Sequence, residues 1–407
     1  MKNICLCLCL LSTTLLGQRG ASIPFEKWIS LKTVSNPVIS PDGKMMVYST
    51  NSTDWANNTY DSELWLVREG ETPLPLTRTA KGSSTMAAFT PDGQYVSFLA
   101  DRGDKTQLHI ISVRGGEAIQ VTRDEDGIGR YDWSPDGKRI VYTKPQPDGK
   151  TEKSTKERYG AFAVEGEEYR HNHLWLLNFH YDSVFLAGQL PCYGAKKDSS
   201  NTAHPPSRDC VKLPVARPLT EGNFSVSGFA WSPDGKYIAF NRQKDPLILS
   251  GISADIVLMD VDSGAMNTVV SHPTGDFFNT WAPDGKAFVY GSSISDSVSD
   301  YYKNNRLFIY DLNSKTSREI ATDIDESVSV AGWASSGLYL GAFEKTKRFL
   351  YRVDLTSGAS TRVNLGLDLP MAFSFAHRGD GVAIAGRSFS GLNELFWWRP
   401  GGPLAKA

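Results

Sequence analysis

The sequence predicts an all-β fold, a seven-bladed β-propeller of four-stranded antiparallel blades, from three observations. A turn phrase recurs along the chain and is most complete at 231–240, which reads Trp-Ser-Pro-Asp-Gly-Lys-Tyr-Ile-Ala-Phe. A large apolar residue precedes each turn at a fixed offset, and an apolar or alternating strand follows it. Two further strands follow each copy before the next begins. Four strands in roughly 40–50 residues is the radial repeat of a propeller blade.

The recurring turn has a physical explanation. Proline presets φ at the first corner, aspartate hydrogen-bonds the local backbone, and glycine adopts positive φ. The successive intervals between the copies are 50, 44, 98, 50, 52 and 42 residues, so one interval is a long outlier. The last two copies are degenerate and lack Pro-Asp. The copies align on Gly43, Gly93, Gly137, Gly235, Gly285, Gly337 and Gly379.

The alternative fold is a large β-sandwich in which these turns are ordinary connections between strands. The apolar residue before each turn argues against it. One bulky side chain in each blade can press against the neighbouring blade, so we expect these residues in the core and not in a ligand site. Stacked blades bury a continuous apolar layer, and 22–407 is therefore predicted to be one domain. The equivalent residues are Ile39, Phe89, Trp133, Trp231, Trp281, Trp333 and Phe375.

The long interval falls in blade three and contains two insertions. The second, 180–213, is polar and rich in turn formers, and we expect an exposed loop. The first, 144–172, is dense in charged and aromatic residues. Long loops on a rigid scaffold often hold recognition groups. Its candidate substrate-binding residues are Glu165, Glu167, Glu168, Tyr169 and Arg170.

The N-terminus indicates export. Lys2 precedes an apolar stretch that is too short to span a membrane, so 1–21 is predicted to be a signal peptide. We therefore expect a secreted or periplasmic protein with no membrane span after cleavage. Only Cys192 and Cys210 then remain, both in the second insertion, and an even pair in an exported protein suggests a disulfide. Free or metal-binding thiols are the competing interpretation, disfavoured because no other soft ligands flank them.

Charge and motifs exclude some classes of function. The formal net charge is −2 and the pI is about 6.4, without a basic stripe, a helix-turn-helix pattern or a phosphate-binding glycine loop. We therefore expect no nucleic-acid partner and no cofactor. His171 and His173 alternate along a strand and share a face. They could share a metal or line the channel, but without a third ligand a structural role is favoured and no metal site is expected.

Several segments resemble a known family. The repeats, the opening 25–37 and above all 157–160 with 169–176 are similar to the N-terminal propeller of the prolyl oligopeptidase superfamily of serine peptidases (family S9). The likeness is to the acylaminoacyl peptidase and dipeptidyl aminopeptidase branch and covers residue 23 to the C-terminus. TolB-type propellers share the WD40-like (PD40) repeats but not the blade-three segment.

The resemblance implies a cap on an α/β-hydrolase domain that admits short or unfolded peptides. The chain has no Gly-x-Ser-x-Gly nucleophile elbow, and the run from Gly386 to Gly391 has the wrong spacing. We therefore expect no catalytic residues and an absent hydrolase domain. The fourth strand of blade seven is only begun by 403–407, which predicts a chain truncated before that domain.

The family also suggests a role for the acidic residues. In dipeptidyl peptidases of this broad family, propeller carboxylates capture the free α-amino group of the substrate, and Glu167 with Glu168 suits that cation. A solvated charged turn is the alternative, because these residues do not match the family pair one by one.

The predicted function is a non-catalytic substrate-gating propeller of an exported peptidase. Its expected partners are short peptides, and a separate α/β-hydrolase domain or envelope proteins. The runner-up is a freestanding TolB-like propeller that acts as a periplasmic binding or scaffold module. A lectin-like propeller ranks lower because the blade-three segment points to peptidases.

Overall fold

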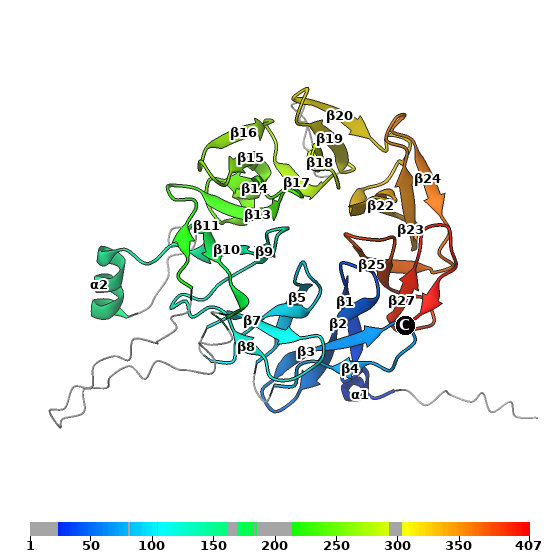
Figure 1. The fold of residues 1–407 in the computed structure, drawn as a ribbon, viewed down its shortest axis with the longest axis horizontal. Helices are drawn as coiled ribbons and strands as arrows, with labels where there is room; N and C mark the ends of the chain where they lie inside the picture. The colour runs from blue at the N-terminus through cyan, green and yellow to red at the C-terminus, as the bar shows by residue number, and fades with distance from the viewer. Residues whose placement is uncertain are drawn as a thin grey trace, which may run out of the picture.

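Seven antiparallel sheets of four strands form a ring in the computed structural model (Figure 1). The sheets follow one another along the chain, and the strands of each sheet follow in order from the innermost to the outermost. This confirms the predicted all-β, seven-bladed propeller. The structure describes residues 23–79, 82–103, 105–160, 169–182, 184, 214–292 and 303–407.

The first four blades are built from β1 to β16. Blade one contains β1 (Thr33–Ile39), β2 (Met45–Asp54), β3 (Thr59–Arg68) and β4 (Leu74–Pro75). Blade two contains β5 (Ser84–Phe89), β6 (Tyr95–Ala100), β7 (Gln107–Ser112) and β8 (Ile119–Gln120). Blade three contains β9 (Tyr131–Trp133), β10 (Arg139–Pro145), β11 (Asn172–Asn178) and β12 (Arg217–Pro218). Blade four contains β13 (Ser225–Trp231), β14 (Tyr237–Gln243), β15 (Asp255–Asp260) and β16 (Met266–Val270).

The last three blades are built from β17 to β28. Blade five contains β17 (Asp276–Trp281), β18 (Ala287–Ser292), β19 (Arg306–Asp311) and β20 (Thr316–Ile320). Blade six contains β21 (Val328–Ala334), β22 (Gly337–Glu344), β23 (Lys347–Val353) and β24 (Ser360–Val363). Blade seven contains β25 (Leu369–Phe375), β26 (Val382–Arg387), β27 (Glu394–Trp398) and β28 (Ala405–Lys406). The helices of the described chain are α1 (Phe25–Ile29), α2 (Lys150–Tyr159) and the 3-10 helix η1 (Ile248–Ser253).

The Ser-Pro-Asp-Gly turn has the hydrogen bonds that its sequence predicts. In blade four the Ser232 hydroxyl donates to Asp234 Oδ1 at 2.6 Å and accepts the backbone N–H of Tyr237 at 2.9 Å. Asp234 Oδ1 also accepts the N–H of Lys236, and Gly235 has φ 72°. The turn therefore starts β14 directly after β13 and sets the pairing register of the two inner strands.

Five of the seven equivalent bulky residues are buried as predicted, but Trp333 and Phe375 are only partly buried. These two lie in the blades whose turns are degenerate. In blades one to four the turn proline lies near the turn glycine of the next blade; a Cβ on Gly93 would lie 3.6 Å from Cδ of Pro41. At the degenerate turns of blades six and seven, a Cβ on Gly337 or Gly379 would meet Arg352 or Asp42 and no proline.

Blade seven closes the ring against blade one. The backbone N–H of Ile39 donates to the Ser374 hydroxyl at 3.1 Å, and Arg399 forms an ion pair with Glu69 at 2.7 Å. The fourth strand of blade seven, which the sequence indicates is only begun by 403–407, is present as β28 and pairs with β27. Its two residues match the length of β4, β8 and β12. So short an outer strand carries almost no periodicity, which is why its extent could not be judged from the sequence.

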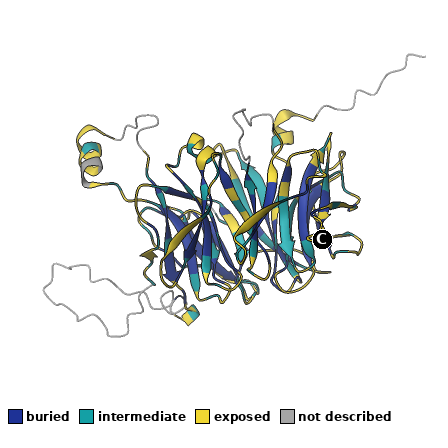
Figure 2. Cartoon of the chain, turned by 90° about the horizontal axis from the view of Figure 1, so that it is seen from above, coloured by how far each residue is buried: buried dark blue, intermediate teal, exposed yellow. Residues whose placement is uncertain are grey.

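Helices α1 and α2 lie at the same face of the ring. Because consecutive strands are antiparallel, the start of each first strand and the loop between the second and third strands lie at the same face. Helix α1, before β1, and helix α2, between β10 and β11, accordingly project from one face (Figure 2). No described helix is long and apolar enough to cross a membrane.

Candidate functional site

The structure places only part of the predicted substrate site. Glu165, Glu167 and Glu168 lie outside the described residues, as do Cys192 and Cys210. Tyr169 and Arg170 are described and lead directly into β11. The candidate site is therefore the base of the first insertion, where α2 leaves β10 and the chain returns at Tyr169.

Arg170 joins three segments at this base. Its Nη1 lies 2.9 Å from Oδ1 of Asp126, in the loop between β8 and β9, and its Nε lies 3.8 Å from Oδ1 of Asp148, just before α2. Lys156 of α2 pairs with the same Asp148 at 2.9 Å, and this hydrogen bond is the main reason that the pKa of Asp148 is lowered. The charge of Arg170 is thus already balanced, and the side chain serves to position the insertion.

A second ion pair holds the other end of the insertion. Lys144 Nζ, at the end of β10, lies 2.9 Å from Oδ2 of Asp124, and both side chains are nearly buried. The same ammonium lies 4.0 Å from the ring centroid of Trp175. Lys144 and Arg170 therefore fasten both ends of the insertion to one acidic loop. Sequence reasoning missed this loop, although the run Asp-Glu-Asp at 124–126 was a visible signal.

Tyr169 packs beside a histidine that is held by blade four. Its ring meets the ring of His171 edge to face, with centroids 5.4 Å apart. His171 is buried, with Nε2 2.9 Å from Oδ1 of Asn223 and Nδ1 3.3 Å from the hydroxyl of Ser225. The imidazole is saturated by these two partners. Tyr169 itself remains 36% exposed.

His173 occupies a structural position that repeats in three blades. A threonine hydroxyl in the outer strand region accepts the N–H of the leucine in the third strand, as Thr220 does from Leu174 at 2.9 Å. That hydroxyl then needs an acceptor, which is Nδ1 of His173 at 3.2 Å. Glu63 and Gln107 supply the acceptor in blades one and two. The structural role favoured from the sequence therefore has a specific basis at His173.

Burial sets the protonation of His173. Desolvation lowers its pKa, and the neighbouring His171 lowers it further. Within the described residues no group of three or more His, Cys, Asp or Glu side chains is placed to hold a metal ion. The described part of the site therefore contains ion pairs and aromatic contacts. Its hydroxyls beside a histidine, Ser225 at His171 and Thr220 at His173, are buried and each accepts a backbone N–H.

The face that carries the site also exposes large apolar side chains. Phe25 and Trp28 of α1 are 69% and 63% exposed, and Trp55 and Tyr60 beside them are 55% and 67% exposed. The Trp55 indole donates to the hydroxyl of Ser30 at 2.9 Å, which fixes α1 against the β2–β3 hairpin. We call Phe25, Trp28, Trp55 and Tyr60 the α1 face. Clustered exposed aromatics of this kind mark contact surfaces.

Fold and site together define a propeller domain with an elaborated, charged third blade. The chain is 26% identical over 395 residues to dipeptidyl-peptidase 5 of Porphyromonas gingivalis, which covers 95% of this chain and 56% of that protein. It is 28% identical over 219 residues to the uncharacterized peptidase YuxL of Bacillus subtilis, covering 52% of this chain and 30% of that protein. The chain thus matches little more than half the length of the first relative and less than a third of the second. No family model matches it.

Solved structures share the fold at 14% sequence identity. Acylaminoacyl peptidase of Pyrococcus horikoshii superposes with a TM-score of 0.64 over 93% of this chain and 52% of its own. The propeller domain of the Trilobed protease of Pyrococcus furiosus superposes with a TM-score of 0.59 over 93% and 96% of the two chains. An oligogalacturonate lyase in complex with manganese also scores 0.59, over 92% and 90%. The chain therefore resembles the propellers of prolyl oligopeptidase superfamily peptidases, as predicted, while the fold alone leaves function open.

Proposed function

We propose that this chain is a non-catalytic propeller that selects peptide substrates for an α/β-hydrolase domain of an exported dipeptidyl or acylaminoacyl peptidase. One observation carries the proposal: similarity to dipeptidyl-peptidase 5 runs over 95% of this chain but only 56% of that protein. The sequence contains no Gly-x-Ser-x-Gly elbow in its 407 residues. Selection and chemistry would then reside in different domains.

The proposed recognition group is the acidic run at Glu165, Glu167 and Glu168, beside Tyr169. A peptide α-ammonium is a cation that adjacent carboxylates bind by charge-assisted hydrogen bonds. Arg170 does not cancel this negative charge, because Asp126 and Asp148 already balance its guanidinium. The two ion pairs at the base of the insertion hold Lys144 and Arg170, which lie before and after the run in the chain, to the loop at 124–126.

The α1 face is the proposed contact surface for the hydrolase domain. Helix α1 projects from the same face of the ring as α2, which precedes the acidic run in the chain (Figure 2). A hydrolase covering this face would shield the exposed side chains of Phe25, Trp28, Trp55 and Tyr60 from water. Aromatic residues are enriched at the centres of such interfaces.

Calorimetric titration with paired peptides tests the recognition proposal. Ala-Pro-Ala with a free amine should bind about tenfold tighter than its N-acetylated form, because only the former carries the cation. Replacing both Glu167 and Glu168 by Gln should abolish the difference, whereas Glu326→Gln, an exposed acid in another blade, should not. Equal affinity for the two peptides in the wild-type chain contradicts the proposal.

Hydrolysis and gene sequence test the domain proposal. The purified chain should not cleave dipeptidyl or aminoacyl chromogenic substrates. DNA downstream of codon 407 should encode Gly-x-Ser-x-Gly followed by Asp and His. An unrelated downstream gene would favour the freestanding TolB-like binding module. Hydrolysis by the purified chain that a serine-directed inhibitor stops would overturn the non-catalytic assignment. Cell fractionation tests the secreted or periplasmic location.

A further inference from the structure

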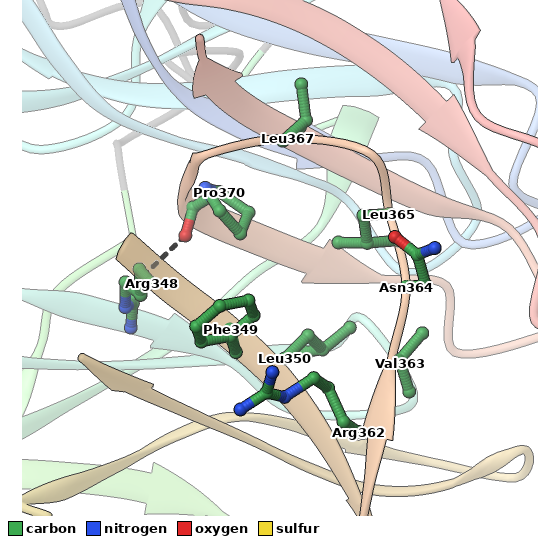
Figure 3. A pocket seen from close by; sticks show the side chains of 9 residues that line it. All are labelled: Arg348, Phe349, Leu350, Arg362, Val363, Asn364, Leu365, Leu367 and Pro370. Carbon is green, nitrogen blue, oxygen red and sulfur yellow. Dashed lines mark hydrogen bonds between the residues drawn. The ribbon is translucent and has the colours of Figure 1, made fainter. Parts of the chain in front are cut away.

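A cavity of about 310 Å³ lies between blades six and seven, beneath the crossover from β24 to β25 (Figure 3). This volume is at the small end of the range typical of ligand pockets. Its walls are mainly apolar and include Leu350, Leu365 and Leu367. Two arginines, Arg348 and Arg362, also line it. The combination of apolar walls and cationic groups specifies the chemistry of a ligand.

Arg362 is already paired. Its Nη2 forms an ion pair with Glu344, and its guanidinium lies over the ring of Phe349, 3.8 Å from the centroid. The pKa of Arg362 is raised, first by the hydrogen bond to Glu344. The nearby Lys347 is paired with Asp368 at 2.8 Å. Neither of these cations requires a further anion.

Arg348 differs from both neighbours because no carboxylate of the described residues pairs with it. Its Nη1 donates to the carbonyl oxygens of Pro370 at 3.0 Å and Met371 at 2.5 Å, and its Nη2 donates to the Ser329 hydroxyl at 3.0 Å. Burial lowers its pKa, and no nearby charge contributes to that shift. Besides these dipoles, the rings of Phe343 and Phe373 lie 5.8 and 5.9 Å from its Cζ. A partly desolvated cation that has dipoles and aromatic rings around it but no counter-charge is the group that a bound anion would stabilise.

Gly341 leaves room for the guanidinium of Arg348. A Cβ on Gly341 would lie 2.6 Å from Nη2 and 3.0 Å from Cζ of Arg348, closer than real contacts allow. Only glycine at 341 therefore lets the guanidinium lie across β22 toward Ser329. Three of the five N–H groups of Arg348 are used by the bonds above, so two remain for a ligand.

We propose that the pocket between blades six and seven binds a small carboxylate that carries an apolar group, with the carboxylate on Arg348 and the apolar group against Leu350, Leu365 and Leu367. This site goes beyond the proposed amine recognition, since it lies in other blades and takes a ligand of opposite charge. Two sources share the chemistry, a free organic acid and the C-terminal residue of a peptide.

Titration with 3-phenylpropanoate and its neutral amide, followed by NMR or calorimetry, tests the proposal. The acid should bind at least about tenfold tighter than the amide. Arg348→Met should remove this preference and leave amide binding unchanged. Glu344→Gln should strengthen acid binding, because it frees Arg362 in the same pocket. Arg217→Met, an exposed arginine of blade three, is the matched control and should change nothing.

Further measurements keep the test decisive if Arg348→Met destabilises the fold. Gly341→Ala retains the charge but displaces the guanidinium, so it should also weaken acid binding. Titration with N-acetyl-alanyl-phenylalanine and its C-terminal amide distinguishes the two sources of the carboxylate. If this peptide acid binds more tightly than 3-phenylpropanoate, the ligand is a peptide C-terminus. If it binds more weakly, the ligand is a free organic acid. Equal affinity for 3-phenylpropanoate and its amide, absence of binding by both, or an acid preference that survives Arg348→Met overturns the proposal.

Discussion

The backbone N–H of Trp231, in blade four, donates a hydrogen bond of 3.0 Å to Oδ2 of Asp132, in blade three. The N–H of Ile39 makes the equivalent bond to Ser374 between blades one and seven. In both pairs the acceptor immediately precedes the bulky residue of its own blade. In these two pairs of neighbouring blades, an inner-strand side chain of one blade thus accepts an inner-strand N–H of the next. At Asp132 the acceptor is ionisable, and burial raises its pKa to about 6.

Asp132→Asn should stabilise the fold at neutral pH. The raised pKa means that the native state holds its proton more tightly than the unfolded chain, so wild-type stability is full below pH 4 and falls as pH rises through 6. Asparagine keeps an acceptor for Trp231 without the buried charge. Chemical denaturation at pH 7 should show a gain of about 1–3 kcal/mol, and the gain should vanish near pH 4.

Asp132→Ala is the matched comparison. It removes the charge and also the acceptor, leaving the N–H of Trp231 buried without a partner, which costs about 1–3 kcal/mol. Its stability should therefore lie below that of Asp132→Asn at every pH. A gain for Asp132→Asn that is independent of pH would refute the charge argument.

Trp231→Ala should cost about 3–5 kcal/mol of unfolding free energy. The side chain is 5% exposed and the guanidinium of Arg139 lies 4.9 Å from its ring centroid. Urea denaturation measures the loss. Trp55→Ala, at a 55% exposed position, should cost less than 1 kcal/mol. A loss at Trp231 as small as that at Trp55 would contradict its position in the core.

The sequence predicts the architecture because each blade repeats the same local chemistry. The turn at Ser232 to Gly235 and the buried residue before it are specified within ten residues, so the fold could be read without homologues. The features that the sequence does not predict depend on contacts between segments far apart in the chain. The pairing of Arg170 with Asp126 joins positions 44 residues apart, and no periodic sequence pattern indicates it.

The candidate site was predicted only in part for the same reason. Tyr169 and Arg170 could be singled out by composition, but their roles differ: Arg170 is neutralised by neighbours, whereas Tyr169 keeps an exposed surface. Arg348 was not singled out from the sequence, because a sequence does not show whether an arginine has a counter-charge beside it. That no carboxylate of the described residues pairs with it becomes apparent only when blades six and seven are placed together.

Gly235→Ala should destabilise the protein by about 1–2 kcal/mol through backbone strain alone. Its φ of 72° disfavours any Cβ, but the added Cβ would lie 3.6 Å from Pro135 Cδ, an ordinary contact. Thermal denaturation measures the loss. Gly103→Ala, where φ is ordinary and no atom lies within 4 Å, should be neutral. A Gly235→Ala cost well above 3 kcal/mol would show a steric clash instead.

His173→Gln should remove an acid-side loss of stability. Because burial lowers the pKa of His173, the unfolded chain binds more protons below about pH 6.5, and wild-type stability falls as pH decreases from there. Glutamine, which blade two uses at Gln107, keeps an acceptor for the Thr220 hydroxyl. Denaturation between pH 5 and 7 should therefore show a flatter profile for the variant. Equal slopes would exclude His173 as the titrating group.

Cys192 and Cys210 should form a disulfide that closes the second insertion. The proposed export to an oxidising compartment and the even number of cysteines after 1–21 both favour the bond. A closed loop of about this size contributes roughly 3 kcal/mol in the chain-entropy model, and less if the loop retains its freedom in the native state. Thiol alkylation of the denatured, non-reduced protein followed by intact-mass analysis should show no adduct, and prior reduction should add two. Two adducts without reduction would rule the bond out and leave the thiols free.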